Sequence, residues 1–262
     1  MSVNSDSIYG TKASPITYDY EWGTVTCKPG KVFLHVFNWK ANYKDMIVLY
    51  GLINKVKKAS LLADSSRNVK VIQEYNEELA YNNLKVMLPG NAPDAYDSVI
   101  SLEIEGELKI DDILLQQPDG RIILNSFQAI VHKGREESQM HLSSGGVIEK
   151  WFNKDDWLSW DFKVIEPGEY ELNLLTKTDF WGEWDFDHEV TIGVAEQEIG
   201  CTVKDDEKYH DKPLHYQDRC MKCGRVSFKN AGNYTLTIKP IVLHSENNRG
   251  LSLRSINLVP VK

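Results

Sequence analysis

The stretch on which the fold prediction rests is Lys31-Val32-Phe33-Leu34-His35-Val36-Phe37. Its apolar residues are too few for a globular helix and are rich in β-branched and aromatic types, so they predict a buried strand. Short apolar runs separated by turn residues recur along the first half of the chain, at 46–50, 84–88, 98–104 and 121–124. Such regular spacing favours an all-β sandwich over helices. The first module is expected to end near Gly106, so that it spans 1–106.

A second set of apolar runs predicts a second β-sandwich over 107–262. The predicted strands are 128–132, 146–150, 157–165, 169–175, 189–194, 225–228, 233–239 and 251–259. Pro167-Gly168 should reverse the chain between two of them, because proline presets φ and glycine accepts positive φ. Residues 197–222 are predicted to be the longest irregular stretch, and no helix of three turns is expected.

Composition and charge exclude several partner classes. The chain of 262 residues has a net charge of −8 and a sequence pI of about 5.4, and contains no Lys/Arg run, which argues against nucleic-acid binding. A neutral, hydroxyl-rich ligand is compatible with this balance. No apolar run approaches the length of a membrane span, so we expect no membrane partner. The first six residues lack the basic and apolar regions of a signal peptide.

The first half also contains several short motifs in a specific order. They are Ser7-Ile8-Tyr9-Gly10-Thr11, Trp22-Gly23, Val32-Phe33-Leu34-His35-Val36-Phe37-Asn38-Trp39, Gly51-Leu52, Ala59-Ser60-Leu61-Leu62, Leu88-Pro89, Ala92-Pro93-Asp94 and Val99-Ile100-Ser101-Leu102-Glu103. Together they resemble the C-terminal β-domain of bacterial retaining α-L-fucosidases, a Greek-key β-sandwich. The resemblance covers roughly residues 3–106.

This resemblance implies a catalytic partner domain and implies that this chain itself lacks catalytic residues. In the family a (β/α)8 barrel carries the two catalytic carboxylates, and the β-domain follows that barrel. A barrel needs about 250 residues of its own, so none is expected here and no catalytic residue is carried over. The expected partners are such a barrel and a glycan. The resemblance also implies that the parent enzyme is periplasmic or secreted.

The second half contains Trp151-Phe152-Asn153-Lys154-Asp155-Asp156-Trp157, then Pro167-Gly168-Glu169-Tyr170, and a closing strand over 251–258. These features resemble galactose-binding-like jelly-roll carbohydrate-binding modules. Many such modules hold a structural calcium ion with an early Glu and a late Asp. The corresponding neighbourhoods here are Asn125-Ser126-Phe127-Gln128 and Arg254-Ser255-Ile256, which makes calcium doubtful and leaves no expected cofactor.

Aromatic, amide and acidic residues predict where a sugar would bind, because aromatic rings stack on sugars while carboxylates and amides bond to hydroxyl groups. The candidate carbohydrate-binding residues are Trp151, Asn153, Asp155, Trp181, Trp184, Asp185, Asn247 and Asn248. The alternative is that these tryptophans pack the ends of the sandwich or contact a barrel. Trp157 and Trp160 lie within a predicted strand and are expected in the core.

The long irregular stretch contains residues of the types that bind zinc. The candidates are Cys201, His210, His215, Cys220 and Cys223. A single two-residue-spaced cysteine pair is weak evidence, and the alternatives are a disulfide involving Cys201 or unmodified thiols. Cys27 is expected to be a small buried residue, and His35 a packed, hydrogen-bonded histidine.

Three functional hypotheses follow. The first is an accessory, non-catalytic pair of β-modules from a fucosidase-like glycoside hydrolase, which supports the barrel and binds glycan. The second is a purely structural assembly without a ligand. The third, a hydrolase in its own right, is disfavoured because adjacent acids such as Asp155-Asp156 point to opposite faces of an extended chain.

Overall fold

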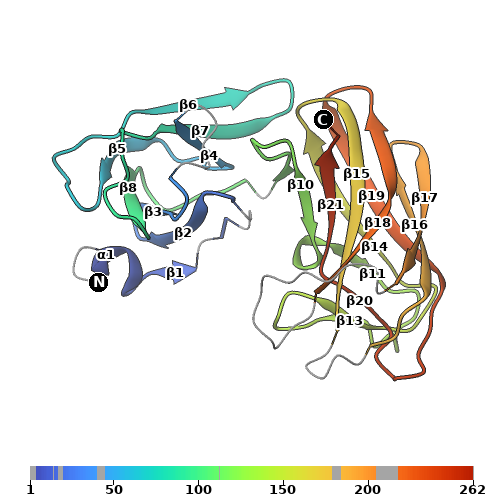
Figure 1. Cartoon of the computed structure of the whole chain (residues 1–262). Coiled ribbons are helices and arrows are strands. Elements are labelled where there is room, and N and C mark those ends of the chain that lie inside the picture. The colour runs from blue at the N-terminus through green and yellow to red at the C-terminus, as the bar shows by residue number, and fades with distance from the viewer. Residues whose placement is uncertain are drawn as a thin grey trace. The chain divides into compact units, whose positions relative to one another are not determined.

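The structure is a computed structural model that describes residues 4–13, 15–16, 20–39, 45–111, 113–178, 184–204 and 218–261. The chain divides into two compact units, Met1–Ile113 (unit 1) and Leu114–Lys262 (unit 2), shown in Figure 1. This division falls a few residues after the boundary predicted at 106. Both units are built almost wholly of antiparallel strands, as predicted. No helix among the described residues is long and apolar enough to cross a membrane.

In unit 1 the elements are α1 (Ser5–Ile8), β1 (Lys12–Ala13), β2 (Gly23–Lys28), β3 (Lys31–Val36), β4 (Met46–Tyr50), β5 (Val56–Leu61), β6 (Val71–Asn76), β7 (Tyr81–Met87) and β8 (Ser98–Ile104). In unit 2 they are β9 (Leu114–Leu115), β10 (Ile122–Asn125), η1 (Ser126–Gln128), β11 (Ile130–His132), β12 (His141–Leu142), β13 (Ile148–Trp151), β14 (Trp157–Val164), β15 (Gly168–Lys177), β16 (His188–Val194), β17 (Gln197–Val203), β18 (Asp218–Phe228), β19 (Gly232–Val242), β20 (Leu251–Leu253) and β21 (Ser255–Pro260).

Unit 1 has a five-stranded sheet in the order β1-β2-β3-β8-β5 and a three-stranded sheet in the order β4-β7-β6. Phe33 and Leu34 of β3 are both fully buried, although they point to opposite faces of the sheet. Burial on both faces explains the unbroken apolar run that predicted this strand. His35 is packed as predicted, and its ring nitrogens contact Thr26 at 3.1 Å and Asp97 at 3.0 Å.

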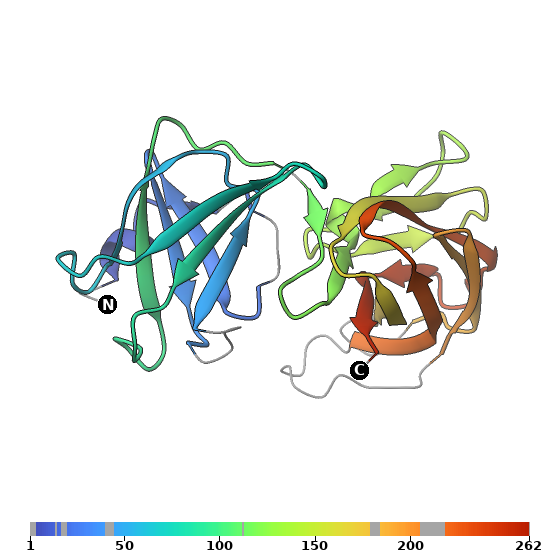
Figure 2. The same ribbon diagram turned by 90° about the horizontal axis from the view of Figure 1, so that it is seen from above.

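Unit 2 contains a sheet in the order β10-β21-β15-β18 and a larger sheet in the order β11-β14-β19-β16-β17, with β9 beside β14. A small third sheet has the order β12-β13-β20, and its strand β20 contacts β15 of the first sheet. Figure 2 shows this unit from above, turned by 90° from the view of Figure 1. Alternate residues of the strands form one core, in which Trp160 is fully buried, as predicted. Trp157 is only half-buried, contrary to prediction, and stacks on His132 with ring centroids 3.5 Å apart.

The Pro167-Gly168 turn is held by side chains. The Tyr170 hydroxyl group donates to the Glu166 carbonyl oxygen at 2.6 Å, and Gln116 accepts the backbone N–H groups of Ile165 and Glu166. Gly168 does not adopt the positive φ that the sequence suggested. The turn therefore depends on Tyr170 and Gln116 more than on glycine.

The predicted irregular stretch 197–222 is wrong at both ends. Residues 197–203 form β17, and residues 218–222 begin β18, whereas 205–217 lie outside the described residues. β17 pairs with β16 through a two-residue hairpin turn, in which Ala195 and Glu196 both have positive φ (50° and 60°). Such turns normally carry Asn or Gly, so the sequence gives no hairpin signal at this position.

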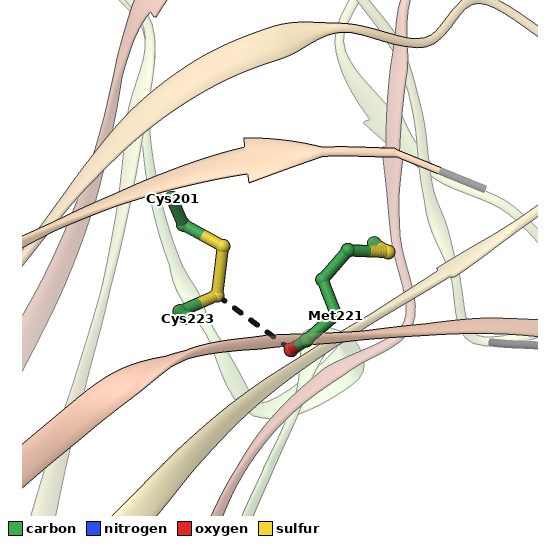
Figure 3. The surroundings of a disulfide bond; sticks show 3 residues. All are labelled: Cys201, Met221 and Cys223. Carbon is green, nitrogen blue, oxygen red and sulfur yellow. Dashed lines mark hydrogen bonds between the residues drawn. A yellow bond between two sulfur atoms is a disulfide. The ribbon is translucent and has the colours of Figure 1, made fainter. Parts of the chain in front are cut away.

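A disulfide joins Cys201 of β17 to Cys223 of β18 (Figure 3). It therefore links edge strands of the two main sheets of unit 2. Leu172 pairs with Gly224 while Asn173 pairs with Lys222, so Cys223 is the extra residue of a β-bulge. A bulge bends the strand and redirects a side chain, which here faces Cys201. Cys27, predicted to be buried, is half-buried.

Candidate functional site

The predicted tryptophan walls are part of the core. Trp151 is 0% exposed and Trp184 is 8% exposed, and both belong to the hydrophobic core of unit 2. The Trp151 indole N–H donates to the Asn153 carbonyl oxygen at 3.2 Å, which completes its burial. These two rings pack the sandwich and leave no face for a sugar, so the alternative reading of packing applies to them. Trp181 lies outside the described residues.

Asp185 and Asn247 lie together, as predicted, but their side chains bond to backbone groups of the protein. The Asp185 carboxylate, 3% exposed, accepts backbone N–H groups from Asn247 at 2.7 Å, Arg249 at 2.8 Å and Gly250 at 2.7 Å. The Asn247 amide donates to the Trp184 carbonyl oxygen at 2.9 Å. Asp185 therefore anchors the loop before β20 and is not available to a ligand.

A neutral histidine supports the same anchor. His188 is fully buried, its Nε2 lies 2.9 Å from the Asp185 carbonyl oxygen, and its Nδ1 accepts the His244 N–H at 3.1 Å. A carbonyl only accepts and an N–H only donates, so these partners select the neutral tautomer with its proton on Nε2. Burial lowers the pKa of His188, although the Asp185 carbonyl oxygen and carboxylate oppose that shift.

The anchored loop continues into a second group of predicted residues. Lys150 donates to the Asn248 carbonyl oxygen at 2.6 Å, and Asn248 itself is exposed. Gly250, with φ of +68°, lies against Phe152, because an added Cβ would come within 2.7 Å of its ring. Phe152 is half-buried and directly precedes Asn153. Residues near 150 and near 248 therefore form one continuous end of unit 2.

A pocket of about 300 Å³ opens at this end beside Phe152. Its lining residues are Arg135, Glu137, Ser138, Gln139, Phe152 and Asn153. They come from two segments only, the loop between β11 and β12 and the turn between β13 and β14. One aromatic ring, two amides, a guanidinium group, a hydroxyl group and a carboxylate thus surround a space open to solvent. Asn153 is the one lining residue that the sequence analysis selected.

A buried carboxylate holds the two pocket segments together. Asp156 is 0% exposed and accepts the Gly134 N–H at 2.8 Å, the Asn153 amide at 3.2 Å and the Ser138 hydroxyl group. Its neighbour Asp155 is exposed and lies 3.4 Å from Arg135. One acid is buried and the other exposed, but the extended chain assumed in the sequence analysis is absent, because Asp155 lies in a turn before β14 begins.

The zinc hypothesis fails for two of its five residues. Cys201 and Cys223 are bonded to each other, so neither supplies the thiolate that zinc requires, and the disulfide alternative for Cys201 is correct. His210 and His215 lie outside the described residues, and Cys220 is buried in β18. Within the described ranges, no three His, Cys, Asp or Glu side chains are grouped to hold a metal ion.

Little in the sequence could have predicted the pocket residues other than Asn153. Residues 133–139 read as a charged surface loop, with no motif spacing. A signal does exist at Asn153-Lys154-Asp155-Asp156, where the Asn153 side chain accepts the Asp155 N–H at 3.2 Å in an Asx turn. That turn predicts a rigid corner, but not which loop packs on it.

No protein-family model and no curated protein matches the sequence. Among solved structures, the α-L-fucosidase from Vibrio sp. strain EJY3 matches 99% of this chain with a TM-score of 0.72 at 22% identity. Isoenzyme 1 of α-L-fucosidase from Paenibacillus thiaminolyticus is 35% identical over 40% of this chain and 24% of its own, with a TM-score of 0.33. This chain spans 43% of the Vibrio enzyme. It therefore shares the fold of a part of an α-L-fucosidase, over nearly its whole length.

Proposed function

We propose that this chain is a non-catalytic accessory region of an α-L-fucosidase-like glycoside hydrolase and that unit 2 binds glycan at the pocket beside Phe152. The fold match with part of the Vibrio enzyme supports the relationship to a hydrolase. The pocket is the observation that carries the binding proposal, because small-molecule sites are concave and combine apolar walls with a few polar groups.

The lining residues suit a sugar. The Phe152 ring offers an apolar face for the C–H groups of a pyranose, and the amides of Gln139 and Asn153 can both donate to and accept from hydroxyl groups. Arg135 adds donors and keeps an exposed guanidinium group at the rim. Two of the residues that the sequence predicted, Asn153 and Asp155, thus belong to the proposed site or its edge, and Asn248 lies on the same end.

Catalysis at this pocket is not favoured. Retaining glycoside hydrolysis uses two carboxyl groups about 5–5.5 Å apart, one on each side of the scissile bond. Glu137 is the only acidic residue among the pocket's lining residues, and Asp156 is buried with its oxygens bonded to the loops. The barrel of a hydrolase is therefore the proposed source of the catalytic residues, and the proposed partner of this chain.

A second candidate function is a purely structural assembly. The burial of Trp151 and Trp184 favours it, because the residues with the greatest capacity for sugar stacking serve the core. Under this alternative the pocket would be an unoccupied surface hollow.

A glycan array separates the two functions. The parent chain should retain a set of glycans, and Phe152→Ala should weaken that retention by about ten-fold or more, which is what loss of one stacking platform costs. Phe186→Ala is the matched control, because Phe186 is also a partly exposed aromatic residue of unit 2 but does not line the pocket. Absence of binding by a folded parent chain would favour the structural alternative.

A further inference from the structure

We infer that the pocket receives a single terminal sugar unit and that Asp156 is the positioning residue that assembles it. This inference rests on the proposed function. The volume of about 300 Å³ lies at the lower limit of the range of about 300–1,000 Å³ in which small-molecule sites occur. A pocket of that size takes the end of a glycan chain, whereas an interior segment needs an extended groove.

The positioning role follows from where the donors to Asp156 originate. Gly134 and Ser138 belong to the β11–β12 loop, and Asn153 belongs to the β13–β14 turn. One carboxylate thus joins both segments that line the pocket. Two of its three donors, Ser138 and Asn153, are themselves lining residues, so their orientation toward a ligand is fixed by the same contact.

Close packing adds to this constraint. A Cβ on Gly134 would lie 2.3 Å from the Asp155 Cβ and 2.8 Å from its backbone, so only glycine lets the loop approach the turn. A site preorganised in this way loses less conformational entropy on binding than one that must order two loops. Asp156 therefore acts on the ligand through Ser138 and Asn153, without touching it.

The first measurement is amide hydrogen exchange of the intact chain. Asp156→Asn should speed exchange at Gly134 by about ten-fold or more, because the acceptor loses its charge and one of its two oxygens is replaced by a donor, while Asp155→Asn should leave it unchanged. Gly134→Ala, which keeps the Asp156 charge, should also loosen the loop if Asp156→Asn proves too unstable to study. Unchanged exchange in both Asp156→Asn and Gly134→Ala would overturn the positioning role, whether or not any glycan binds.

The second measurement is competition. Methyl α-L-fucoside should displace a fucose-terminated oligosaccharide from the parent chain. Asp156→Asn should lower the affinity for both ligands by about ten-fold or more. Failure of the monosaccharide to displace a bound oligosaccharide would overturn recognition of a terminal unit and leave the proposed function standing. If neither Asp156→Asn nor Gly134→Ala changes the affinity for these ligands, the ligands bind at a different site. If the parent chain binds neither probe nor any arrayed glycan, the proposed function and terminal-unit recognition both fail.

Discussion

At the scale of single residues, the Asp185 carboxylate is a buried acidic group whose partners are backbone N–H groups. Its oxygens accept three backbone N–H groups within 2.8 Å while the side chain is almost fully buried. Asp185→Asn replaces one acceptor oxygen with a donor that faces other donors. We expect the free energy of unfolding to fall by about 2–3 kcal/mol, the cost of losing hydrogen bonds to a buried charged group. Urea unfolding measures this change.

Asp187→Asn is the control for that variant. Asp187 is exposed and has φ of 59°, a conformation that asparagine tolerates well, so its unfolding free energy should match the parent's. Equal destabilisation by both substitutions would contradict the role given to Asp185.

His188 gives unit 2 a pH-dependent stability. Its pKa is lowered in the folded state, so between that value and the unfolded value of about 6.5 the unfolded chain binds more protons. Stability is therefore full above pH 6.5 and is lost as the pH falls through the folded pKa. Urea unfolding at pH values from 7.5 to 5 should show this decline. His188→Gln, which does not titrate, should show a smaller decline, and equal slopes would exclude His188 as the cause.

At this scale the sequence predicted residue types better than residue roles. It selected Asp185, Asn247 and Asn153, which do lie at one end of unit 2, but it assigned Trp151 and Trp184 to a surface. A tryptophan beside carboxylates has the same local sequence whether its ring is buried or exposed. Burial depends on the strands packed above it, which no local pattern encodes.

At the scale of elements, the Cys201–Cys223 disulfide is a covalent link between the two main sheets of unit 2. It joins residues 22 positions apart on edge strands of different sheets. Closing a loop of that length stabilises the folded state by about 3 kcal/mol in the chain-entropy account. Reduction of the parent chain should therefore lower the free energy of unfolding by about that amount in a urea titration.

The matched control is the double variant Cys201→Ser, Cys223→Ser. It should already have the lower stability, and a reducing agent should not change it further. A parent chain whose stability is the same with and without reductant would show that the cross-link adds nothing to the fold.

Strands with continuous apolar runs were predicted well, whereas strands that combine polar and apolar residues, such as β6 and β17, were missed. β4 and β8 fall at the predicted positions because their residues are mostly buried. β6 was missed because its four central residues are exposed, and β17 because residues of mixed polarity follow a turn without glycine. Such strands form because a neighbour supplies hydrogen bonds, and that information lies far away in the sequence.

At the scale of the whole molecule, each unit should fold by itself. Among the described residues, unit 2 has one hydrophobic core formed wholly from its own residues, and its disulfide is internal. We expect the fragment 114–262 to unfold cooperatively in urea and to keep the near-ultraviolet signal of its buried tryptophans. A fragment that lacks a cooperative transition would show that unit 2 depends on residues outside it.

The all-β class and the presence of two modules could be predicted from strand spacing and from ordered motifs. The pocket could not, because it arises where a buried carboxylate joins two separate loops. Asp156 accepts hydrogen bonds from Gly134, 22 positions away, and from Asn153, 3 positions away. Sequence patterns record periodicity within elements, whereas this site depends on contacts between loops.

We propose above all that the chain binds glycan without cleaving it. Frontal affinity chromatography over the immobilised chain, with mass detection of a fucosylated oligosaccharide in the eluate, tests both parts at once. If this proposal is correct, the glycan elutes late and with its mass unchanged. Elution with an unretained marker, or as a product lacking its fucose, would contradict it.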